Sequence, residues 1–435
     1  MHMLKFLLKS LFAVFIILAI FILVFLYDIF STGQKIFSGN ENSSIIKQLG
    51  ELVFNPAEKL KGEDGERINI LLLGIGGEGH SGGELTDTIM IASIKPTTNE
   101  ASLLSIPRDL YVQVPDANRG SKINAVKFLG DKSKEKNGIE LLKRTVSKIS
   151  GLDIHYYVQL DFKGFIKIID DLGGIDVYLK NDINDPAYPN FSHGYDPFYI
   201  TKGWHHLDGA TALKVARSRH SRMGDFDRIE RQQDIIKTAK QKASEKYSKF
   251  DIFTFKKILD SMSDNLKTDI QVKELPRFYK ISKKIKNHKI TTEVIDTKRY
   301  LNRTYIGAGY TLQAKDRTYN DIKNLNESIF NIEISEEEKE LIKNENALIE
   351  IQNGTNSLDL ANKIAEDLED FGYKIINSKN IDAPDFLGVR IYDNSKKTKP
   401  NTLEFLKEKF NAVIMEMPND EFTKADFVIV LGKGF

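Results

Sequence analysis

The sequence contains no cysteine among its 435 residues. Disulfide bonds, thiolate nucleophiles and metal sites with cysteine ligands are therefore excluded. An excess of one charge is also missing, because 62 lysine and arginine residues stand against 61 aspartate and glutamate residues. The resulting net charge of +1 argues against a protein that binds nucleic acid through bulk positive charge.

The histidines lack the spacing of a zinc site, because the sequence has no H-x-x-H or H-E-x-x-H segment. His80, His205, His206 and His220 are instead expected to pack or to hydrogen-bond near the basic stretch of residues 217–233, which is a candidate for phosphate binding. The single tryptophan, Trp204, is expected in a packed core or at a domain rim rather than in a sugar-binding platform.

Only one long hydrophobic run occurs, over residues 10–27, with Lys5 and Lys9 before it and Asp28 after it. About 20 such residues span a hydrocarbon core as a helix. The run is long and no A-x-A cleavage site follows, which favours a retained anchor over a cleaved signal peptide. The flanking charges place the N-terminus in the cytoplasm, so we expect a single-pass protein of the cell membrane.

Composition and pattern divide the rest of the chain. We predict a cytoplasmic N-terminus and membrane helix over residues 1–30, a stalk over 31–66, a large domain over 67–330, a charged linker over 331–345 and a second domain over 346–435. In the last segment, strand-like runs alternate with amphipathic helices, including one over residues 358–371 that Gly372 ends. This pattern predicts a small α/β domain.

A glycine-rich segment follows the first strand-like run, residues 68–73, and reads Gly74-Ile-Gly-Gly-Glu-Gly79. It matches the G-x-G-x-x-G pattern of dinucleotide-binding folds, but that pattern requires a helix at the third glycine. Here Gly82 and Gly83 follow, and then a second strand-like run over residues 85–94. Strand, glycine loop and strand predict a hairpin, so the glycines are expected to let the backbone approach a ligand or turn.

Charged side chains stand near the ends of these apolar strands. Asp87 lies in the second strand, Arg108 follows the third, and Lys122 and Asn124 are expected in a later loop. A carboxylate in this position suits a hard cation such as Mg²⁺, although a surface-facing aspartate is the structural alternative. Strand ends are where α/β folds place their ligands.

The richest polar stretch covers residues 217–233. If Arg217 and Arg219 are extended, their side chains share one face. In the following helix, expected to begin near Asp227, the spacing of three and four residues puts another polar set on one face: Asp225, Arg228 and Gln232. Guanidinium forks suit bidentate contact with phosphate. The alternative is a solvated loop in which Asp225 or Asp227 caps the helix, with Glu230 completing a capping box.

These segments resemble the LytR-CpsA-Psr family in matching order over residues 67–330. The segments are Leu85-Thr-Asp-Thr-Ile-Met90, Ser105-Ile-Pro-Arg-Asp109, Ser121-Lys-Ile-Asn-Ala125, Gly203-Trp-His-His-Leu-Asp-Gly209 and Val215-Ala-Arg-Ser-Arg-His220 followed by Asp225-x-x-Arg228-x-x-x-Gln232. Near the C-terminus, Ile351-Gln-Asn-Gly-Thr355 and Asp426-x-Val-Ile-Val-Leu-Gly432 are similar to the domain appended to LytR-type proteins.

The resemblance implies a membrane-anchored bacterial enzyme that transfers a glycopolymer from a polyprenyl-diphosphate carrier to peptidoglycan, outside the cytoplasmic membrane. It implies a membrane helix, an α/β/α-layered catalytic domain with a central mixed sheet, and a small C-terminal α/β domain. The implied partners are the lipid-linked glycan, peptidoglycan and the membrane, and the implied cofactor is Mg²⁺.

The resemblance also assigns roles to residues. Asp87 would hold Mg²⁺, and the diphosphate would be bound by Arg108, Lys122, Arg217, Arg219, Arg228 and Gln232. Catalysis would involve Asp87, Arg108, Arg217, Arg219 and Asp225. The general base is left open between Asp225 and Asp109.

Two positions depart from the family pattern, which has an aspartate where this chain has Gly76 and an arginine where it has Leu85. Glu78, His80 or Glu84 are candidates to compensate. The departures keep open the alternative of a polyprenyl-phosphate-binding envelope regulator without enzymatic activity. A lipid diphosphate hydrolase, which would use water as the acceptor, is a third possibility.

Overall fold

The computed structural model describes residues 59–432, apart from positions 66, 81, 116–118, 191–193, 221–223, 247–263, 286–288, 307–308, 331–335, 356–359, 371, 385, 387, 411 and 418–422. The predicted anchor over residues 10–27 and most of the predicted stalk lie outside these residues. In the part that is described, no helix combines the length and the apolar character needed to cross a membrane.

A six-stranded sheet organises the larger part of the molecule, with its strands in the order β11-β6-β1-β2-β3-β12. Neighbours β1 and β2 are antiparallel, whereas β1 with β6 and β3 with β12 are parallel. The predicted central mixed sheet and the predicted hairpin around the glycine loop are therefore confirmed. The strands are β1 (Ile68–Ile75), β2 (Thr86–Lys95), β3 (Glu100–Ser105), β6 (Tyr156–Asp161), β11 (Leu266–Thr268) and β12 (Ile290–Val294).

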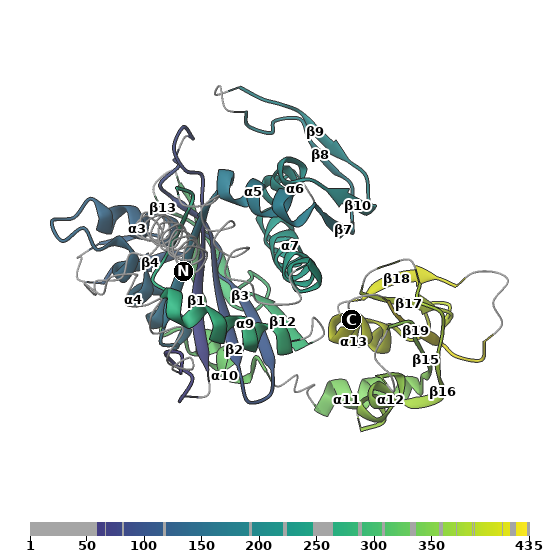
Figure 1. Cartoon of the computed structure of the whole chain (residues 1–435). Coiled ribbons are helices and arrows are strands. Elements are labelled where there is room, and N and C mark those ends of the chain that lie inside the picture. The colour runs from purple at the N-terminus through teal and green to yellow at the C-terminus, as the bar shows by residue number, and fades with distance from the viewer. Residues whose placement is uncertain are drawn as a thin grey trace, which may run out of the picture.

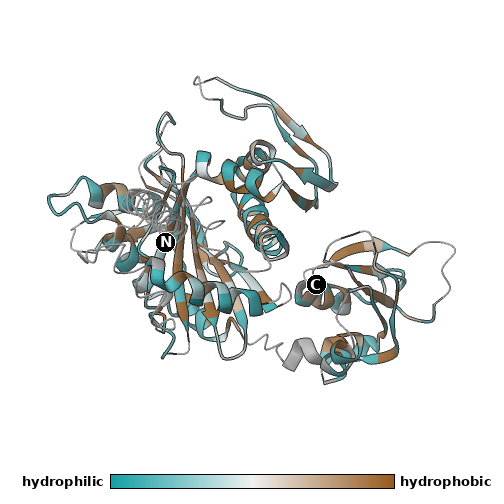
Figure 2. Cartoon of the chain, viewed as in Figure 1, coloured by the Kyte–Doolittle hydropathy of each residue, from teal (hydrophilic) through white to brown (hydrophobic). Residues whose placement is uncertain are grey.

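Alternate residues of β1 point to two different cores, as expected for a strand that is covered on both faces. Leu71 and Leu73 pack in one core with residues of the first helical layer. Ile68 and Ile70 pack in the other core, with residues of α9. The first layer contains α3 (Ile123–Asp131), α4 (Gly138–Ser150) and α10 (Asn320–Ser328), and the second contains α9 (Leu275–Lys284) after the 3-10 turn Val272–Glu274 (Figure 1). Figure 2 shows the apolar strands enclosed between helices with polar outer surfaces.

A second unit follows β6 and forms its own core around Ile175, Val215 and Ile235. It consists of α5 (Phe162–Leu172), β7 (Ile175–Leu179), β10 (Gly203–Leu207), α6 (Gly209–Arg217) and the long helix α7 (Asp225–Lys246). Asp208 begins α6 by accepting a hydrogen bond from the Thr211 N–H at 2.8 Å. From this unit the hairpin of β8 (Ile183–Asp185) and β9 (Phe198–Ile200) extends as an arm (Figure 1).

Two further hairpins lie beside the end of β3. They are β4 (Tyr111–Gln113) with β5 (Gly120–Lys122), and β13 (Leu301–Ile306) with β14 (Gly309–Ala314). The structure corrects the expectation that Lys122 and Asn124 lie in a loop. Lys122 ends β5, and Asn124 lies in the first turn of α3, because Ile123 is fully buried and begins an amphipathic helix.

The C-terminal segment has a separate five-stranded sheet in the order β16-β15-β19-β17-β18. Its elements are α11 (Glu336–Glu345), β15 (Leu348–Asn353), α12 (Leu360–Asp370), β16 (Lys374–Asn380), β17 (Val389–Asp393), α13 (Pro400–Phe410), β18 (Val413–Glu416) and β19 (Phe427–Leu431). The structure differs from the predicted linker, because residues 336–345 form α11. Ile342 of that helix is buried in the core of this domain.

Candidate functional site

Charged side chains from four parts of the fold meet where β2 begins and β3 ends. Asp87 is the second residue of β2, and Arg108 and Asp109 follow β3. Lys122 comes from the end of β5, and the first turn of α7 brings Asp225 and Arg228. Residues that are up to 141 positions apart in sequence therefore form one cluster, which we call the arginine–aspartate cluster.

Asp87 is held by arginines on both its side chain and its backbone. Arg108 Nη1 donates to Asp87 Oδ1. Arg228 Nη2 donates to the Asp87 carbonyl oxygen at 3.3 Å. The Asp87 side chain remains one third exposed, at 33%. Asp87 is thus fixed in position by two arginines while part of its carboxylate faces solvent.

Arg219, Asp225 and Arg228 form the second part of the cluster. Asp225 Oδ1 lies 3.1 Å from Arg228 Nη1 and 3.4 Å from Arg219 Nε. Burial of Arg228 lowers its pKa to about 10, with the neighbouring charges of Arg219 and Arg108 acting in the same direction and Asp225 opposing them. Burial and the charge of Arg108 also lower the pKa of Arg219. Crowded guanidinium groups of this kind are stabilised by an anion placed among them.

Asp109 forms the third part of the cluster. Lys122 Nζ lies 2.6 Å from Asp109 Oδ1, and Arg108 Nε lies 3.8 Å from Asp109 Oδ2. The Nε atoms of Arg108 and Arg228 are both buried, and neither donates a hydrogen bond to any residue that the structure describes. The cluster therefore has donor capacity that its own carboxylates do not use.

Arg217 differs from the predicted extended conformation, because it is the last residue of α6. The extended backbone starts at Ser218, which is buried. The Arg217 guanidinium stacks over the Phe162 ring at 4.3 Å and over the Tyr188 ring at 5.1 Å. Arg217 Nη1 also donates to the Tyr188 hydroxyl at 3.0 Å. These contacts hold the plane of the guanidinium in one orientation.

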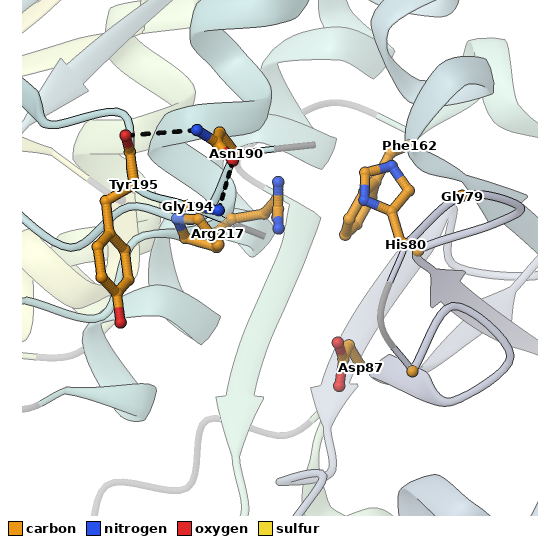
Figure 3. A pocket seen from close by; sticks show the side chains of 11 residues that line it. Gly79, His80, Asp87, Phe162, Asn190, Gly194, Tyr195 and Arg217 are labelled. Atoms are coloured by element: carbon orange, nitrogen blue, oxygen red, sulfur yellow. Dashed lines mark hydrogen bonds between the residues drawn. The ribbon is translucent and has the colours of Figure 1, made fainter. Parts of the chain in front are cut away.

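A pocket of about 280 Å³ lies between the glycine loop and the loop that joins β8 to β9 at the tip of the arm. Figure 3 shows Asp87 and Arg217 on its wall, with His80 and Phe162 nearby. Its other lining residues are Gly76, Gly79, Gly82, Pro189, Asn190, Gly194 and Tyr195. Pockets for drug-sized ligands occupy about 300–1,000 Å³. This pocket therefore suits a compact polar group rather than a folded polymer.

Both walls of the pocket are built by local backbone contacts. Gly77 N–H donates to the Gly83 carbonyl at 3.0 Å, and a Cβ on Gly83 would lie 2.0 Å from the Gly77 oxygen. Only glycine at position 83 permits this close approach. On the other wall, Asn190 Oδ1 accepts from the Gly194 N–H at 2.8 Å. Burial, followed by the charge of Arg217, lowers the pKa of His80, so the ring favours its neutral form.

Gln232 lies beside the cluster, but its amide is engaged by the protein. Its Oε1 accepts from the Thr88 hydroxyl at 3.2 Å, and its Nε2 donates to the Ala216 carbonyl at 3.0 Å. These bonds connect β2, α6 and α7 close to Asp87 and Arg217. Gln232 is therefore placed to position its neighbours, and the predicted helix face of Asp225, Arg228 and Gln232 lies toward β2.

The predictions for the remaining histidines and Trp204 can be placed in the fold. His206 Nδ1 lies 2.7 Å from Asp176 Oδ1, and His205 Nε2 lies 2.7 Å from the Thr201 carbonyl. His220 Nδ1 lies 2.6 Å from Asp185 Oδ1. Trp204 is 36% exposed and packs edge-on against Tyr178, which agrees with a position at a domain rim.

The cluster offers few of the ligands that a divalent metal needs from the protein alone. Among the residues that the structure describes, no group of three or more His, Asp or Glu side chains has the geometry of a metal site. Mg²⁺ commonly uses one or two protein carboxylates together with water and substrate phosphates. Asp87 fits that mode of binding, because it lines the pocket and is partly exposed.

Several residues at this site were not predicted from the sequence, among them Phe162 and Tyr195, which line the pocket, and Tyr188, which holds Arg217 beside it. Phe162 is the first residue of α5 and directly follows Asp161, the last residue of β6. The polar residue at the end of this strand was the one sequence signal that could have indicated that Phe162 lies near the site. Tyr188 and Tyr195 belong to the loop between β8 and β9, a segment without hydrophobic periodicity. Their part in the site depends on the fold of the arm over Arg217.

Comparison with known proteins gives two family matches. The model of the LytR_cpsA_psr family matches residues 26–328, and the model described as LytR cell envelope-related transcriptional attenuator matches residues 346–435.

Curated relatives match over the first of these regions. The polyisoprenyl-teichoic acid–peptidoglycan teichoic acid transferase TagU of Bacillus anthracis (strain CDC 684 / NRRL 3495) is 30% identical over 261 residues, which cover 57% of this chain and 78% of the relative. Regulatory protein MsrR of Staphylococcus aureus (strain COL) is 33% identical over 177 residues, which cover 40% of this chain and 49% of the relative. The crystal structure of protein gbs0355 from Streptococcus agalactiae covers 65% of this chain and 93% of its own, with a TM-score of 0.51 and 21% identity, and therefore supports the fold alone.

Proposed function

The chain belongs to the LytR_cpsA_psr family, and on that premise we propose that it transfers a glycopolymer from a polyprenyl-diphosphate carrier to peptidoglycan. The name of the TagU relative, a transferase between a polyisoprenyl-linked polymer and peptidoglycan, supports this proposal. So does the match of the family model over more than half of the chain.

The observation that carries the proposal is the charge of the site. Five cationic side chains surround three carboxylates there, namely Arg108, Lys122, Arg217, Arg219 and Arg228 around Asp87, Asp109 and Asp225. The excess is 5 − 3 = 2 positive charges. A diphosphate diester carries two negative charges and accepts the paired hydrogen bonds that guanidinium forks donate. Net positive charge in a partly enclosed pocket therefore suits this substrate class.

The reaction exchanges one phosphorus–oxygen bond for another. An acceptor hydroxyl oxygen attacks the phosphorus that bears the glycan, and the bond from that phosphorus to the bridging oxygen breaks. The glycan becomes attached through a phosphodiester, and the lipid departs as a monophosphate with the bridging oxygen. The hydroxyl proton passes to a carboxylate, for which Asp225 and Asp109 are the two candidates in the cluster.

Each part of the site has a separate task in this proposal. Arg217, locked between Phe162 and Tyr188, orients one phosphate in the pocket. Arg108 and Arg219 neutralise the charge that gathers on the leaving oxygen, because preorganised donors stabilise developing charge most strongly in a site with little water. Arg228 is almost fully buried, at 3% exposure, and holds Asp87 and Asp225 in place.

Mg²⁺ is part of the proposal, with Asp87 as its protein ligand. A bound Mg²⁺ supplies positive charge to phosphate oxygens, which lowers the barrier to displacement. Gly76 and Leu85 contribute no metal-binding group of their own. The metal would then be held by Asp87 together with substrate phosphates, and its affinity in the absence of donor would be low.

The location proposed for this activity is the outer side of the cell membrane. The support is the uncharged run over residues 10–27 with lysines before it and an aspartate after it. The domain boundaries at residues 30, 66 and 330 belong to the same proposal, whereas α11 assigns residues 336–345 to the C-terminal domain. A single-pass anchor would keep the site close to the membrane in which its lipid substrate resides.

The proposal is tested with the full-length protein in detergent, a polyprenyl-diphosphate oligosaccharide, peptidoglycan fragments and Mg²⁺. Release of lipid monophosphate together with glycan attachment, both lost in Asp87→Ala and Arg217→Ala, is the expected result. Release without attachment would identify a hydrolase. Tight donor binding without release, across several donors and acceptors, would identify the non-enzymatic binder that the departures at Gly76 and Leu85 leave as the alternative.

A further inference from the structure

The β13–β14 hairpin is packed into the core at one end and exposed to solvent at the other. At its base, Leu301 and Leu312 are buried in the core that also contains Leu110. Further out, Tyr305 is 70% exposed and Tyr310 is 37% exposed. Large exposed aromatic side chains on a protruding hairpin are a feature that a binding role explains.

The register of the hairpin places these tyrosines on the same face as Leu312, whose side chain is buried in the core. Arg303 pairs with Leu312 and Tyr305 pairs with Tyr310. Directly opposed residues in an antiparallel pair share a face, as do residues two apart in one strand. Arg303, Tyr305, Tyr310 and Leu312 therefore lie on one face, and Leu312 fixes its base against the core.

This face begins at the arginine–aspartate cluster. The Leu312 N–H donates to the Asp109 carbonyl at 2.9 Å. Burial raises the pKa of Tyr310, and the negative charges of Asp109 and Asp225 raise it as well, while Arg303 lowers it. Tyr310 is therefore within electrostatic range of both candidate proton acceptors. The donor pocket, lined by Arg217 and Asp87, includes none of the hairpin residues.

The chemistry of the face is that of a carbohydrate-binding surface. The rings of Tyr305 and Tyr310 meet edge to face, with centroids 6.0 Å apart and planes at 73°. Each ring offers an apolar surface to the C–H groups of a sugar and a hydroxyl to its polar groups. Arg303 adds a cation that suits a carboxylate carried by the glycan.

We propose that Arg303, Tyr305 and Tyr310 form the acceptor subsite, which binds a peptidoglycan glycan strand and leads its hydroxyl to the carboxylates of Asp109 and Asp225. This inference rests on the proposed function, because the surface acquires its role from a reaction with two substrates. The reacting phosphorus belongs to the donor, and the acceptor hydroxyl must also be able to reach it. The cluster reaches both the donor pocket and the hairpin, because Asp87 lines the pocket and the Asp109 carbonyl accepts a hydrogen bond from Leu312 of the hairpin.

A membrane surface is the other partner that exposed tyrosines can fit, and it is disfavoured here. Insertion into a membrane requires the aromatic side chains to point away from the protein toward the tip. Tyr310 is the less exposed of the two tyrosines, and the negative charges of Asp109 and Asp225 contribute to its raised pKa, which indicates that it faces the cluster. Vesicle binding is therefore included in the test as an outcome that would overturn the proposal.

The test measures binding of soluble peptidoglycan glycan oligomers to the full-length protein in detergent, without donor. Tyr305→Ala and Tyr310→Ala are each expected to raise Kd roughly tenfold, because each removes a stacking ring. Tyr305→Trp, which keeps an aromatic ring, should bind within about twofold of the wild type. Tyr199→Ala is the matched control, since Tyr199 is 62% exposed on a different hairpin, and its Kd should not change.

Three results would overturn the inference. They are unchanged glycan binding in both tyrosine-to-alanine variants, an equal loss in Tyr199→Ala, and loss of binding to anionic lipid vesicles in the hairpin variants with glycan binding intact.

Transfer kinetics separate this inference from the proposed function. The hairpin variants should raise the acceptor KM and leave the donor KM unchanged. Glycan binding that depends on the hairpin, without any donor turnover by the wild type, would overturn the proposed function and leave the glycan-binding surface in place. Turnover without dependence on the hairpin would overturn the subsite alone.

Discussion

Arg228 donates a hydrogen bond to the backbone carbonyl of Asp87 at 3.3 Å, which joins the first turn of α7 to the second residue of β2. The same nitrogen donates to Asp225 Oδ2 at 3.1 Å. Arg228 is 3% exposed, so this guanidinium acts as an internal brace of the site. The position of Asp87, which lines the pocket, therefore depends on an arginine that solvent hardly reaches.

Removal of this brace should destabilise the protein. Arg228→Gln leaves Asp225 without its closest cationic partner in a largely buried place, and we expect a loss of about 3 kcal/mol in the free energy of unfolding. Arg299→Gln is the control, because Arg299 is 48% exposed in its pair with Glu293 and should cost below about 1 kcal/mol. The measurement is thermal unfolding of both variants. Equal decreases in their thermal midpoints would contradict a bracing role for Arg228.

Binding of the donor should depend on the planar shape of the Arg217 guanidinium as well as on its charge. Arg217→Lys keeps the charge but loses the planar fork and the stacking on Phe162 and Tyr188. We expect the donor KM to rise roughly tenfold, with little change in thermal stability. Arg299→Lys, at an exposed position, should leave the KM unaltered. Wild-type donor KM in Arg217→Lys would show that charge alone is sufficient.

Asp87 should determine how donor cleavage depends on the Mg²⁺ concentration. After chelation and titration with Mg²⁺, Asp87→Asn should lower donor cleavage by roughly a hundredfold or more and shift half-saturation to higher Mg²⁺. Asp109→Asn serves as the comparison, since Asp109 is occupied by Lys122 and should alter turnover without changing the Mg²⁺ half-saturation. Wild-type metal dependence in Asp87→Asn would rule out its role as the ligand.

His155 gives the stability of the catalytic domain a dependence on pH. Its Nδ1 accepts from the Asn69 N–H at 3.0 Å, which requires an unprotonated nitrogen. Burial lowers the pKa of His155 below its usual 6.5, and the charges of Lys143 and Lys61 lower it further. As the pH falls below 6.5, the unfolded chain takes up a proton that the folded protein resists, so stability declines.

The measurement for His155 is the thermal midpoint at pH 7.5 and pH 5.5 for the wild type and His155→Gln. Glutamine keeps an acceptor for Asn69 but does not titrate. The wild type should therefore lose more stability on acidification than the variant. An identical loss in both proteins would assign the pH dependence to other groups.

Sequence patterns were sufficient for elements in which burial follows a simple period. The apolar runs that became β1 and β2 were predicted because both faces of these strands are covered, and Asp87 stood out as the polar exception within one of them. The helix leading to Arg217 was predictable because Asp208 and Thr211 provide a cap at its start. The family motifs then identified the charged residues that these elements bring together.

Other features depend on contacts that no local pattern records. Residues 336–345 are so highly charged that they read as a linker, yet the burial of Ile342 against the C-terminal domain supports a helix there. The role of Tyr188 depends on a hydrogen bond to Arg217, which lies 29 residues further along the chain. Arg217 itself was expected in an extended segment because α6 ends only one residue later than its apolar pattern suggested.

The central claim is that the phosphate next to the glycan moves with the glycan to peptidoglycan. It is tested by following two radiolabelled donors, one with ³²P in the glycan-proximal phosphate and one with ³²P in the lipid-proximal phosphate. The account predicts that the first label appears in peptidoglycan and the second is released as lipid monophosphate, and that Arg219→Gln loses both the transfer and the release. Glycan-proximal label recovered in the lipid or as inorganic phosphate, with none in peptidoglycan, would contradict the account.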